Sequence, residues 1–156
     1  MTSPTRLLMH VPVPWVFVLA YLIGAIPEHF QHRVLSPQTA QITTIVGSIL
    51  FALGALVAGW GLLLFRKANT TTVPGKLSAQ LVTRGPYRFT RNPMYIGLTL
   101  AYLGEAALLK QILPLAFLPL TIAYLNWTVI PVEEAKLREV FPIEYPDYCS
   151  RVRRWL

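Results

Sequence analysis

Long apolar runs separated by short polar connectors dominate the chain. The runs cover residues 11–27, 42–65, 94–109 and 112–130. The second run, at about 24 residues, is long enough to cross a bilayer as a helix, and the other three are near the short end of that range. This pattern predicts an all-α fold, an integral membrane bundle of about four transmembrane helices in which the last two form a C-terminal helical hairpin.

The segments around the first run leave two alternatives open. Arg6 before it could belong to a signal peptide, but no small-residue cleavage site follows cleanly, so we expect a retained span. After it, Glu28, His29 and His32 form a polar connector. Two histidines at this spacing with a nearby carboxylate could bind a metal ion; because no third ligand is evident, we favour a solvated loop and expect no metal site.

Two features inside the apolar runs bear on packing and chemistry. The glycines of the second run are spaced irregularly, yet they would let a neighbouring helix approach closely; they are Gly47, Gly54, Gly59 and Gly61. Glu105 is an acid inside the third run, either a functional carboxylate or one paired with Lys110 or Arg33. We favour the structural interpretation because Glu105 lies near the far end of its helix, remote from the arginines that precede the run.

Composition and charge place the chain in lipid. Hydrophobic residues make up 54% of it and charged residues only 13%, whereas a soluble domain carries about a quarter charged residues. The net charge is +7, but the basic residues collect at the ends of apolar runs, which argues against nucleic acid. In a four-span topology one side holds 12 Lys and Arg residues and the other 2, so we expect the first side, with both termini, in the cytoplasm. The single cysteine, Cys149, excludes an internal disulfide.

The stretch 81–97, LVTRGPYRFTRNPMYIG, departs most from a plain helical bundle. Gly85-Pro86 predicts a turn, and Asn92-Pro93 predicts a helix start with Asn as the N-cap. The free N–H groups of Met94 and Tyr95 would then point out of the helix start, where an anion is attracted. With Arg84, Arg88 and Arg91, the stretch offers cations, aromatic faces and backbone donors at one membrane surface.

A second polar block follows Pro131, which ends the fourth run. Glu133 and Glu134 are adjacent and would project about 100° apart on a helix, so Glu134 can pair with Arg138 while Glu133 faces a pocket. Tyr145 and Tyr148 would share a helix face, as interface anchors or as walls of a site. The tail arginines would, in the simplest interpretation, contact anionic headgroups; they are Arg151, Arg153 and Arg154.

Together these blocks resemble the membrane methyltransferases of the isoprenylcysteine carboxyl methyltransferase and phospholipid methyltransferase group. The pattern there runs GPY, Arg-His-Pro-x-Tyr-x-Gly, Glu-Glu-x-x-Leu and Phe-Gly-x-x-Tyr-x-x-Tyr with a basic tail. Here it reads GPY at 85–87, RNPMYIG at 91–97, EEAKL at 133–137 and FPIEYPDY at 141–148. Asn92 replaces the usual His, and Pro142 replaces a Gly.

The resemblance implies a single membrane-embedded methyltransferase domain over residues 1–156, with catalytic segments 76–97 and 131–154. It implies S-adenosylmethionine as methyl donor and S-adenosylhomocysteine as product. It also implies that Arg91 and Arg151 bind an acceptor carboxylate and that Glu133 holds the donor's ammonium. The cofactor-binding residues that it implies are Leu81, Val82, Gly85, Tyr87, Asn92, Pro93, Tyr95, Glu133, Glu134, Tyr145 and Tyr148.

Several functions stay open on this evidence. The first is O-methylation of an isoprenylcysteine-like carboxylate, which needs no base at neutral pH; the acceptor would enter from the bilayer. The next is N-methylation of a phospholipid or other lipid amine, which needs a base such as Glu133 or Glu134. A non-catalytic protein that binds anionic lipid through its basic face, and a nicotinamide-dependent reductase related by fold, are further alternatives. We expect membrane lipids as partners, with no nucleic acid.

Overall fold

The computed structural model describes residues 12–30, 35–67 and 80–156. The expectations for Arg6, His32 and Arg33 therefore lie outside the described residues. All regular structure in the described ranges is helical, which confirms the predicted class for this part of the chain. The elements are α2 (Val13–His29), α3 (Pro37–Lys67), η1 (Gly85–Arg88), α4 (Pro93–Leu108), α5 (Leu113–Tyr124), η2 (Leu125–Val129), α6 (Ile130–Val140) and α7 (Glu144–Arg151).

Two of the described helices are long and apolar enough to cross a membrane. One is α3, with 31 residues, and the other is the continuous helix Leu113–Val140 formed by α5, η2 and α6. Helix α2 is apolar but shorter, at 17 residues. A four-span topology therefore stays a proposal.

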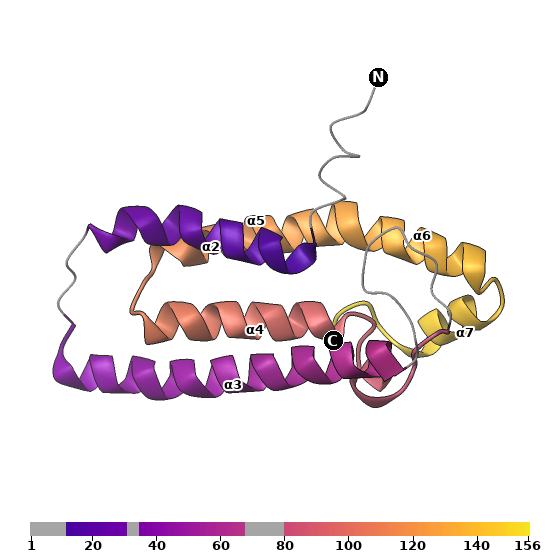
Figure 1. The fold of residues 1–156 in the computed structure, drawn as a ribbon, viewed down its shortest axis with the longest axis horizontal. Helices are drawn as coiled ribbons and strands as arrows, with labels where there is room; N and C mark the ends of the chain where they lie inside the picture. The colour runs from indigo at the N-terminus through magenta and orange to yellow at the C-terminus, as the bar shows by residue number, and fades with distance from the viewer. Residues whose placement is uncertain (1–11, 31–34, 68–79) are drawn as a thin grey trace, which may run out of the picture.

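The long helices lie side by side as two pairs (Figure 1). Helix α3 packs along α4, and α2 packs along α5, while α4 and α5 contact each other at few positions. Sequence neighbours α4 and α5 thus each have another helix as main partner, so the expected hairpin between them also stays a proposal.

Glycines form the seam between α3 and α4. A Cβ added at Gly54 would lie 2.5 Å from the Gly97 carbonyl oxygen, and one at Gly47 would lie 2.7 Å from the Leu108 nitrogen. Real Cβ atoms do not come this close, so the two backbones touch directly at these positions. The close helix approach predicted from the glycines is confirmed here, although nothing lies within 4 Å at Gly59.

The sequence suggested that Glu28 lies in a solvated connector, and this expectation is wrong. Helix α2 continues to His29, and Glu28 is buried within its last turn. Its Oε2 accepts hydrogen bonds from the backbone N–H groups of Ile112 and Leu113, both at 2.7 Å. These groups lie at the start of α5, where a helix has unsatisfied donors. The carboxylate is therefore buried because it caps a neighbouring helix, a tertiary contact that local polarity does not reveal.

Pro131 does not interrupt the last long helix. The five residues of η2 form a π-helical turn directly before α6, and Pro131 occupies the beginning of α6. A π turn shifts the hydrogen-bond register by one residue. Because this shift accommodates the missing N–H of Pro131, the helix continues, and Glu133 and Glu134 lie on the same continuous helix as the apolar α5. Helix α5 likewise continues through Pro119, and a kink there stays a prediction.

The turn between α4 and α5 lies at the opposite end of α4 from Arg91. Lys110 has a left-handed backbone with φ of 58°, and the Gln111 N–H donates to the Ala106 carbonyl, which confirms the predicted polar turn. Glu105 lies near this end of α4, as expected, and the described residues contain no ion pair between Glu105 and Lys110.

Candidate functional site

The two polar blocks, separated in sequence, meet at the end of the bundle that carries η1, α7 and the C-terminus (Figure 1). Gly85 opens η1 with φ of 61°, which a residue without Cβ adopts readily. The Tyr148 hydroxyl donates to the Tyr87 carbonyl at 2.7 Å, and the Arg91 N–H donates to the Arg153 carbonyl at 2.9 Å. The chain around Arg91 is therefore held by α7 and the tail that follows it.

Asn92 connects the start of α4 to the C-terminal tail. It occupies the N-cap position and Pro93 the first turn, as predicted, but its side chain does not cap the helix. Instead its Nδ2 donates to the Arg154 carbonyl at 2.9 Å, and the Thr90 hydroxyl donates to the same oxygen at 3.1 Å. The Asn92 amide makes this contact to the tail, so the contact does not need the imidazole of the usual His.

The expectation of free N–H donors at this helix start is wrong for Tyr95. Its N–H donates to the Asn92 carbonyl at 3.1 Å. The first turn closes on itself because the cap residue's own carbonyl lies within reach. The Tyr95 N–H is therefore not available to an anion at this helix start.

Glu134 is the centre of an ion-pair cluster. It is 5% exposed. Arg154 binds it with two nitrogens, Nε at 3.0 Å and Nη2 at 2.9 Å, and these bonds raise the pKa of Arg154. Arg91 approaches it at 3.3 Å and Arg138, one helical turn along, at 3.7 Å. We call Glu134, Arg91, Arg138 and Arg154 the arginine cluster. The predicted Glu134–Arg138 pair is confirmed, and the cluster ties α6 to the segment before α4 and to the tail.

Glu133 points to a different group from Glu134. Its Oε1 accepts a hydrogen bond from the Tyr95 hydroxyl on α4 at 2.8 Å. The adjacent carboxylates therefore diverge, as helical geometry predicted. Of these two acids, Glu134 alone forms ion pairs with arginines within the described part of the chain.

Buried tyrosines surround these acids. Tyr87 and Tyr145 are 4% and 2% exposed, and Tyr148 is 5% exposed. Burial raises the pKa of Tyr87 and Tyr145, and raises that of Tyr148 to about 12, so all three hydroxyls stay protonated at neutral pH. Tyr145 and Tyr148 share a face and contact each other, with ring centroids 6.2 Å apart.

Two buried polar atoms at this end have no hydrogen-bond partner among the described residues. They are the Tyr87 hydroxyl oxygen and the Arg91 Nε. Buried polar groups are nearly always satisfied, and exceptions often mark a place where a ligand or water completes the bonding. Both atoms belong to residues that the sequence pattern had singled out.

The remaining predicted site residues occupy varied positions. Leu81 packs against the Tyr145–Tyr148 pair, and Val82 is half-buried. Gly85 lies against the side chains of Trp60 and Leu64 on α3. Arg151 is exposed and forms an ion pair with Asp147 at 2.6 Å, on its own helix, so the structure does not bring it into the arginine cluster.

Several residues of this end were not predicted from the sequence. Asn126 accepts hydrogen bonds from Arg154 Nη1 at 3.3 Å and from the Trp155 indole at 3.2 Å. Cys149 accepts one from Arg91 Nη1. Of these residues, Asn126 could have been identified from the sequence, because a lone amide within the apolar run 112–130 needs a polar partner. Arg154, assigned to lipid headgroups in the simplest interpretation, is instead bound to Glu134.

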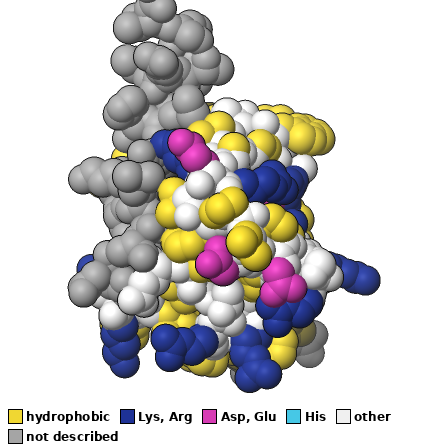
Figure 2. Space-filling view, turned by 90° about the vertical axis from the view of Figure 1, so that its right-hand side faces the viewer, with side chains coloured by type: hydrophobic (Ala, Val, Ile, Leu, Met, Phe, Trp, Pro, Cys, Tyr) yellow, Lys and Arg dark blue, Asp and Glu magenta, His cyan; other side chains and the backbone are white. Residues whose placement is uncertain are grey.

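Seen from outside, this end is basic at its rim. Figure 2 shows Lys and Arg side chains around the face, with fewer acidic ones between them. Exposed arginines of η1, α6, α7 and the tail contribute to it; they are Arg84, Arg88, Arg138, Arg151 and Arg153. The site residues therefore lie beneath a surface that attracts anions.

Comparison with known sequences defines the class of the protein. The family described as phospholipid methyltransferase matches residues 42–144, and the chain belongs to this family. The resemblance stated from the two motif blocks is thereby confirmed.

Individual relatives are more distant. The chain is 27% identical to a probable protein-S-isoprenylcysteine O-methyltransferase of Oryza sativa subsp. indica, over 90% of this chain and 75% of that protein. It is 35% identical over 79 residues to the nickel-cobalt-cadmium resistance protein NccN of Alcaligenes xylosoxydans xylosoxydans, and 34% identical over 79 residues to the cobalt-zinc-cadmium resistance protein CzcN of Cupriavidus metallidurans.

The two resistance proteins are matched only in part. Each alignment covers 51% of this chain, and only 37% and 36% of the respective relative. No solved structure matches the chain. Among residues 12–30, 35–67 and 80–156, no group of three or more His, Cys, Asp or Glu side chains could hold a metal ion.

Proposed function

We propose that the protein is an integral membrane methyltransferase that uses S-adenosylmethionine to methylate a lipophilic acceptor. One observation carries the proposal: the GPY–RNPMYIG block and the Glu133–Glu134 block come together at one end of the bundle. Arg91 lies 3.3 Å from Glu134, and the Tyr95 hydroxyl lies 2.8 Å from Glu133. Membership of the phospholipid methyltransferase family supports the reaction class.

The residues present fit the proposed donor. S-adenosylmethionine carries an ammonium and a carboxylate beside the sulfonium that supplies the methyl group. Glu133 is a carboxylate with no cation among its described contacts, so it is suited to hold an ammonium. The buried Tyr87 hydroxyl, which has no hydrogen-bond partner within the described ranges, is a donor suited to a polar atom of the same ligand. Glu134, saturated by arginines, positions Arg91 and the tail.

A carboxylate acceptor is the leading candidate. Arg91 Nη1 is engaged by Glu134 and Cys149, but its Nε has no hydrogen-bond partner among the described residues. A buried guanidinium N–H is a strong donor for a carboxylate oxygen. Methyl transfer is a displacement in line with the leaving sulfur, so the main task of these residues is to fix two reactive partners in orientation. A role for Arg151 would require its pair with Asp147 to open.

An amine acceptor is the second candidate, favoured by Glu133. This carboxylate is not neutralised by an arginine in the described structure, and its hydrogen bond from Tyr95 orients it. A base in that position could take the proton that an amine loses on methylation. The lipid amine of a phospholipid would then be the acceptor.

The proposed orientation places this end at the cytoplasmic leaflet. The exposed arginines of η1, α7 and the tail all lie there, and Lys and Arg gather on the cytoplasmic side of membrane proteins. Both termini would then be cytoplasmic, and the protein multi-pass. The donor would enter from water and the acceptor from the bilayer.

The test of the reaction is methyl transfer by the purified full chain. With a donor carrying labelled methyl, farnesylcysteine analogues and phosphatidylethanolamine are offered separately. Label released by base identifies a methyl ester and supports the carboxylate acceptor; base-stable label in the phospholipid supports the amine. Absence of transfer to either acceptor, together with no binding of S-adenosylhomocysteine by calorimetry, contradicts the proposal.

The role of Glu133 is tested by Glu133→Gln. Removing a charged partner of the donor should weaken S-adenosylhomocysteine binding roughly 10- to 100-fold, since a hydrogen bond to a charged group contributes about 1.5–3 kcal/mol. Glu139→Gln, an exposed acid on the same helix, is the matched control and should bind normally. If Glu133→Gln lowers the free energy of unfolding by as much as it lowers the free energy of S-adenosylhomocysteine binding, the Glu133 carboxylate is structural.

A further inference from the structure

Four exposed cations gather where the end of α3 meets η1, and we call them the basic patch. They are Arg66, Lys67, Arg84 and Arg88. The turn η1 packs against the end of α3, where the ring centroids of Tyr87 and Phe65 lie 5.4 Å apart. Figure 2 shows Lys and Arg side chains along the lower edge of this end of the molecule, the level at which Figure 1 places α3. Two segments that are separate in sequence therefore contribute to one basic surface.

The charges of the basic patch are not neutralised by acids of its own segments. No Asp or Glu occurs between residues 30 and 104. Within residues 12–30, 35–67 and 80–156, none of the four cations forms an ion pair. The α6–α7 side of the same end differs, because Glu134 and Asp147 there are paired with arginines. A concentration of unpaired positive charge attracts an anion from outside the chain.

The position of the basic patch favours lipid as the source of this anion. Leu56, Trp60 and Leu63 recur at helical spacing on α3, and all three are exposed. Lys67, also exposed, continues this row by one turn. A Cβ added at Gly85 would lie 3.2 Å from ring atoms of Trp60, so η1 borders the same row. Tryptophan and cations at the end of an apolar helix are typical of the head-group region, so a lipid along this row would have its head group at the basic patch.

The inner side of η1 belongs to the candidate site. Tyr87 is buried, whereas Arg84 and Arg88 at the two ends of η1 are exposed. The Tyr87 carbonyl accepts the hydrogen bond from Tyr148, and Arg91 follows four residues later. A single 3₁₀ turn has weak hydrogen bonds of its own, so its position depends on what holds it. An anion bound by Arg84 and Arg88 would restrain η1 from outside, as Tyr148 does from inside.

We infer that the basic patch binds the head group of an acidic phospholipid from the surrounding leaflet, and that the bound lipid restrains η1 and thereby strengthens binding of the methyl donor. Arginine and lysine bind phosphate through charge-assisted hydrogen bonds. The lipid acts here as a ligand and not as the methyl acceptor. Its effect on the donor rests on the proposed methyltransferase function, whereas the lipid preference of the patch can be measured without turnover.

Selective lipid binding is tested by fluorescence quenching at Trp60. The full chain is placed in phosphatidylcholine nanodiscs that contain a small share of either brominated phosphatidylglycerol or brominated phosphatidylcholine, since bromine on an acyl chain quenches a tryptophan that it contacts. The Trp60 signal is the difference between the wild type and Trp60→Phe. Phosphatidylglycerol should reach the same quenching at a share about fivefold lower, which corresponds to about 1 kcal/mol. Equal quenching by the two lipids overturns the site.

Two matched arginine variants separate the basic patch from the general charge of this end. Arg88→Gln removes a cation of the patch, and Arg153→Gln removes an exposed cation of the tail. Arg88→Gln should lower the preference for phosphatidylglycerol about fivefold, and Arg153→Gln should keep it. Equal losses in both variants would show a diffuse basic surface and overturn the defined site. Reversal of the quenching by glycerol 3-phosphate, at the same concentration as phosphatidylglycerol, would overturn the assignment to lipid.

Calorimetry with S-adenosylhomocysteine distinguishes this inference from the proposed function. In nanodiscs with phosphatidylglycerol the compound should bind about fivefold more tightly than in phosphatidylcholine alone, the low end of usual coupling between sites. Arg88→Gln should abolish this difference. Selective quenching with equal affinity in both nanodiscs overturns the effect on the donor and leaves the methyltransferase proposal standing. Selective quenching without any S-adenosylhomocysteine binding supports the lipid site and overturns the proposed function.

Discussion

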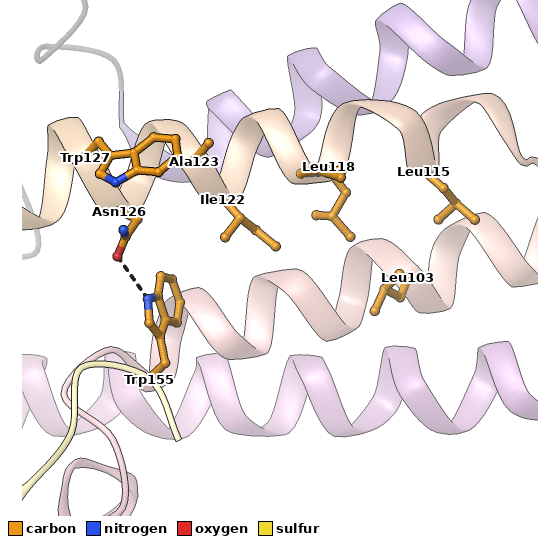
Figure 3. A pocket seen from close by; sticks show the side chains of 9 residues that line it. Leu103, Leu115, Leu118, Ile122, Ala123, Asn126, Trp127 and Trp155 are labelled. Atoms are coloured by element: carbon orange, nitrogen blue, oxygen red, sulfur yellow. Dashed lines mark hydrogen bonds between the residues drawn. The ribbon is translucent and has the colours of Figure 1, made fainter.

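The α3–α4 interface and the α4–α5 interface are built from similarly apolar helices, yet one is sealed and the other is open. Along α3–α4 the backbones touch at the glycines, and a Cβ at Gly97 would lie 2.6 Å from the Ala58 nitrogen. Along α4–α5 the large side chains Leu103, Leu118 and Ile122 face each other across a groove (Figure 3). Side-chain size at the contact, and not overall hydrophobicity, decides which interface closes.

The open interface is held at its two ends by polar contacts. At one end the Tyr102 hydroxyl of α4 donates to the Pro114 carbonyl of α5 at 2.6 Å, and Glu28 of α2 caps the same start of α5. At the other end, which is the polar end of the groove, Asn126 binds Arg154 and Trp155 of the tail. In lipid the gain from burying apolar surface between helices is small, so packing and hydrogen bonds provide most of the association energy. This arrangement leaves a space between α4 and α5 without separating them. The contrast can be tested by weakening each kind of contact in turn.

The largest effect is expected from Glu134→Gln. This change leaves Arg91 and Arg154 without their buried counter-charge, and breaking a buried ion pair on one side costs about 3–5 kcal/mol. The free energy of unfolding in detergent, measured by denaturant titration, should fall by about that amount. The control Glu139→Gln should leave it unchanged. A loss of less than about 1 kcal/mol, the scale of an exposed pair, would show that the cluster is solvated and does not hold this end.

The next largest loss of stability is expected at the sealed α3–α4 interface, from Gly54→Ala. The added methyl meets the backbone of Ala101 and the Gly97 carbonyl, which cannot move away as a side chain could. Overpacking of this kind costs about 1–3 kcal/mol. Gly59→Ala is the matched control on the same helix, since nothing lies within 4 Å there; it should be neutral or stabilising. Equal unfolding temperatures for the two variants would contradict direct backbone contact.

Much of this contrast was accessible from the sequence, because it depends on local geometry. Glycines on an apolar helix predict a close approach whichever helix supplies the partner. The divergence of Glu133 and Glu134 follows from about 100° per residue, and the turn at Gly85 from its proline neighbour. In each case a short stretch of chain determines the outcome.

The polar closures were not accessible in the same way, because each depends on where a distant backbone lies. Glu28 is buried only because the start of α5 presents two N–H groups to it. The tail arginines differ in their contacts and exposure because α7 ends at Arg151 and the backbone of Val152 is extended, with φ of −127° and ψ of 128°. Extended backbone turns successive side chains to opposite sides, so Arg154 reaches Glu134 while Arg153 is exposed. No local pattern marks which arginine is used.

A moderate effect is expected at the other polar closure, from Glu28→Gln. The glutamine keeps an oxygen that can accept from the Ile112 and Leu113 N–H groups but loses the charge that strengthens both bonds. We expect the free energy of unfolding to fall by about 1–2 kcal/mol. Hydrogen exchange should increase at the start of α5 and stay unchanged in α3. Faster exchange in both helices alike would mean that Glu28 stabilises the whole bundle and is not a local cap.

The smallest effect is expected from Trp155→Phe, which keeps an aromatic wall at the polar end of the groove but removes the indole N–H that binds Asn126. A single such bond contributes about 0.5–1.5 kcal/mol net, and Arg154 still occupies the Asn126 oxygen. Global stability should therefore fall by under about 1 kcal/mol, while carboxypeptidase trimming of the C-terminus becomes faster. Trp127→Phe is the control, because this ring is 75% exposed on the outer wall. If both variants are trimmed at the wild-type rate, the Trp155–Asn126 bond does not fasten the tail, and the polar end is held by Arg154 alone.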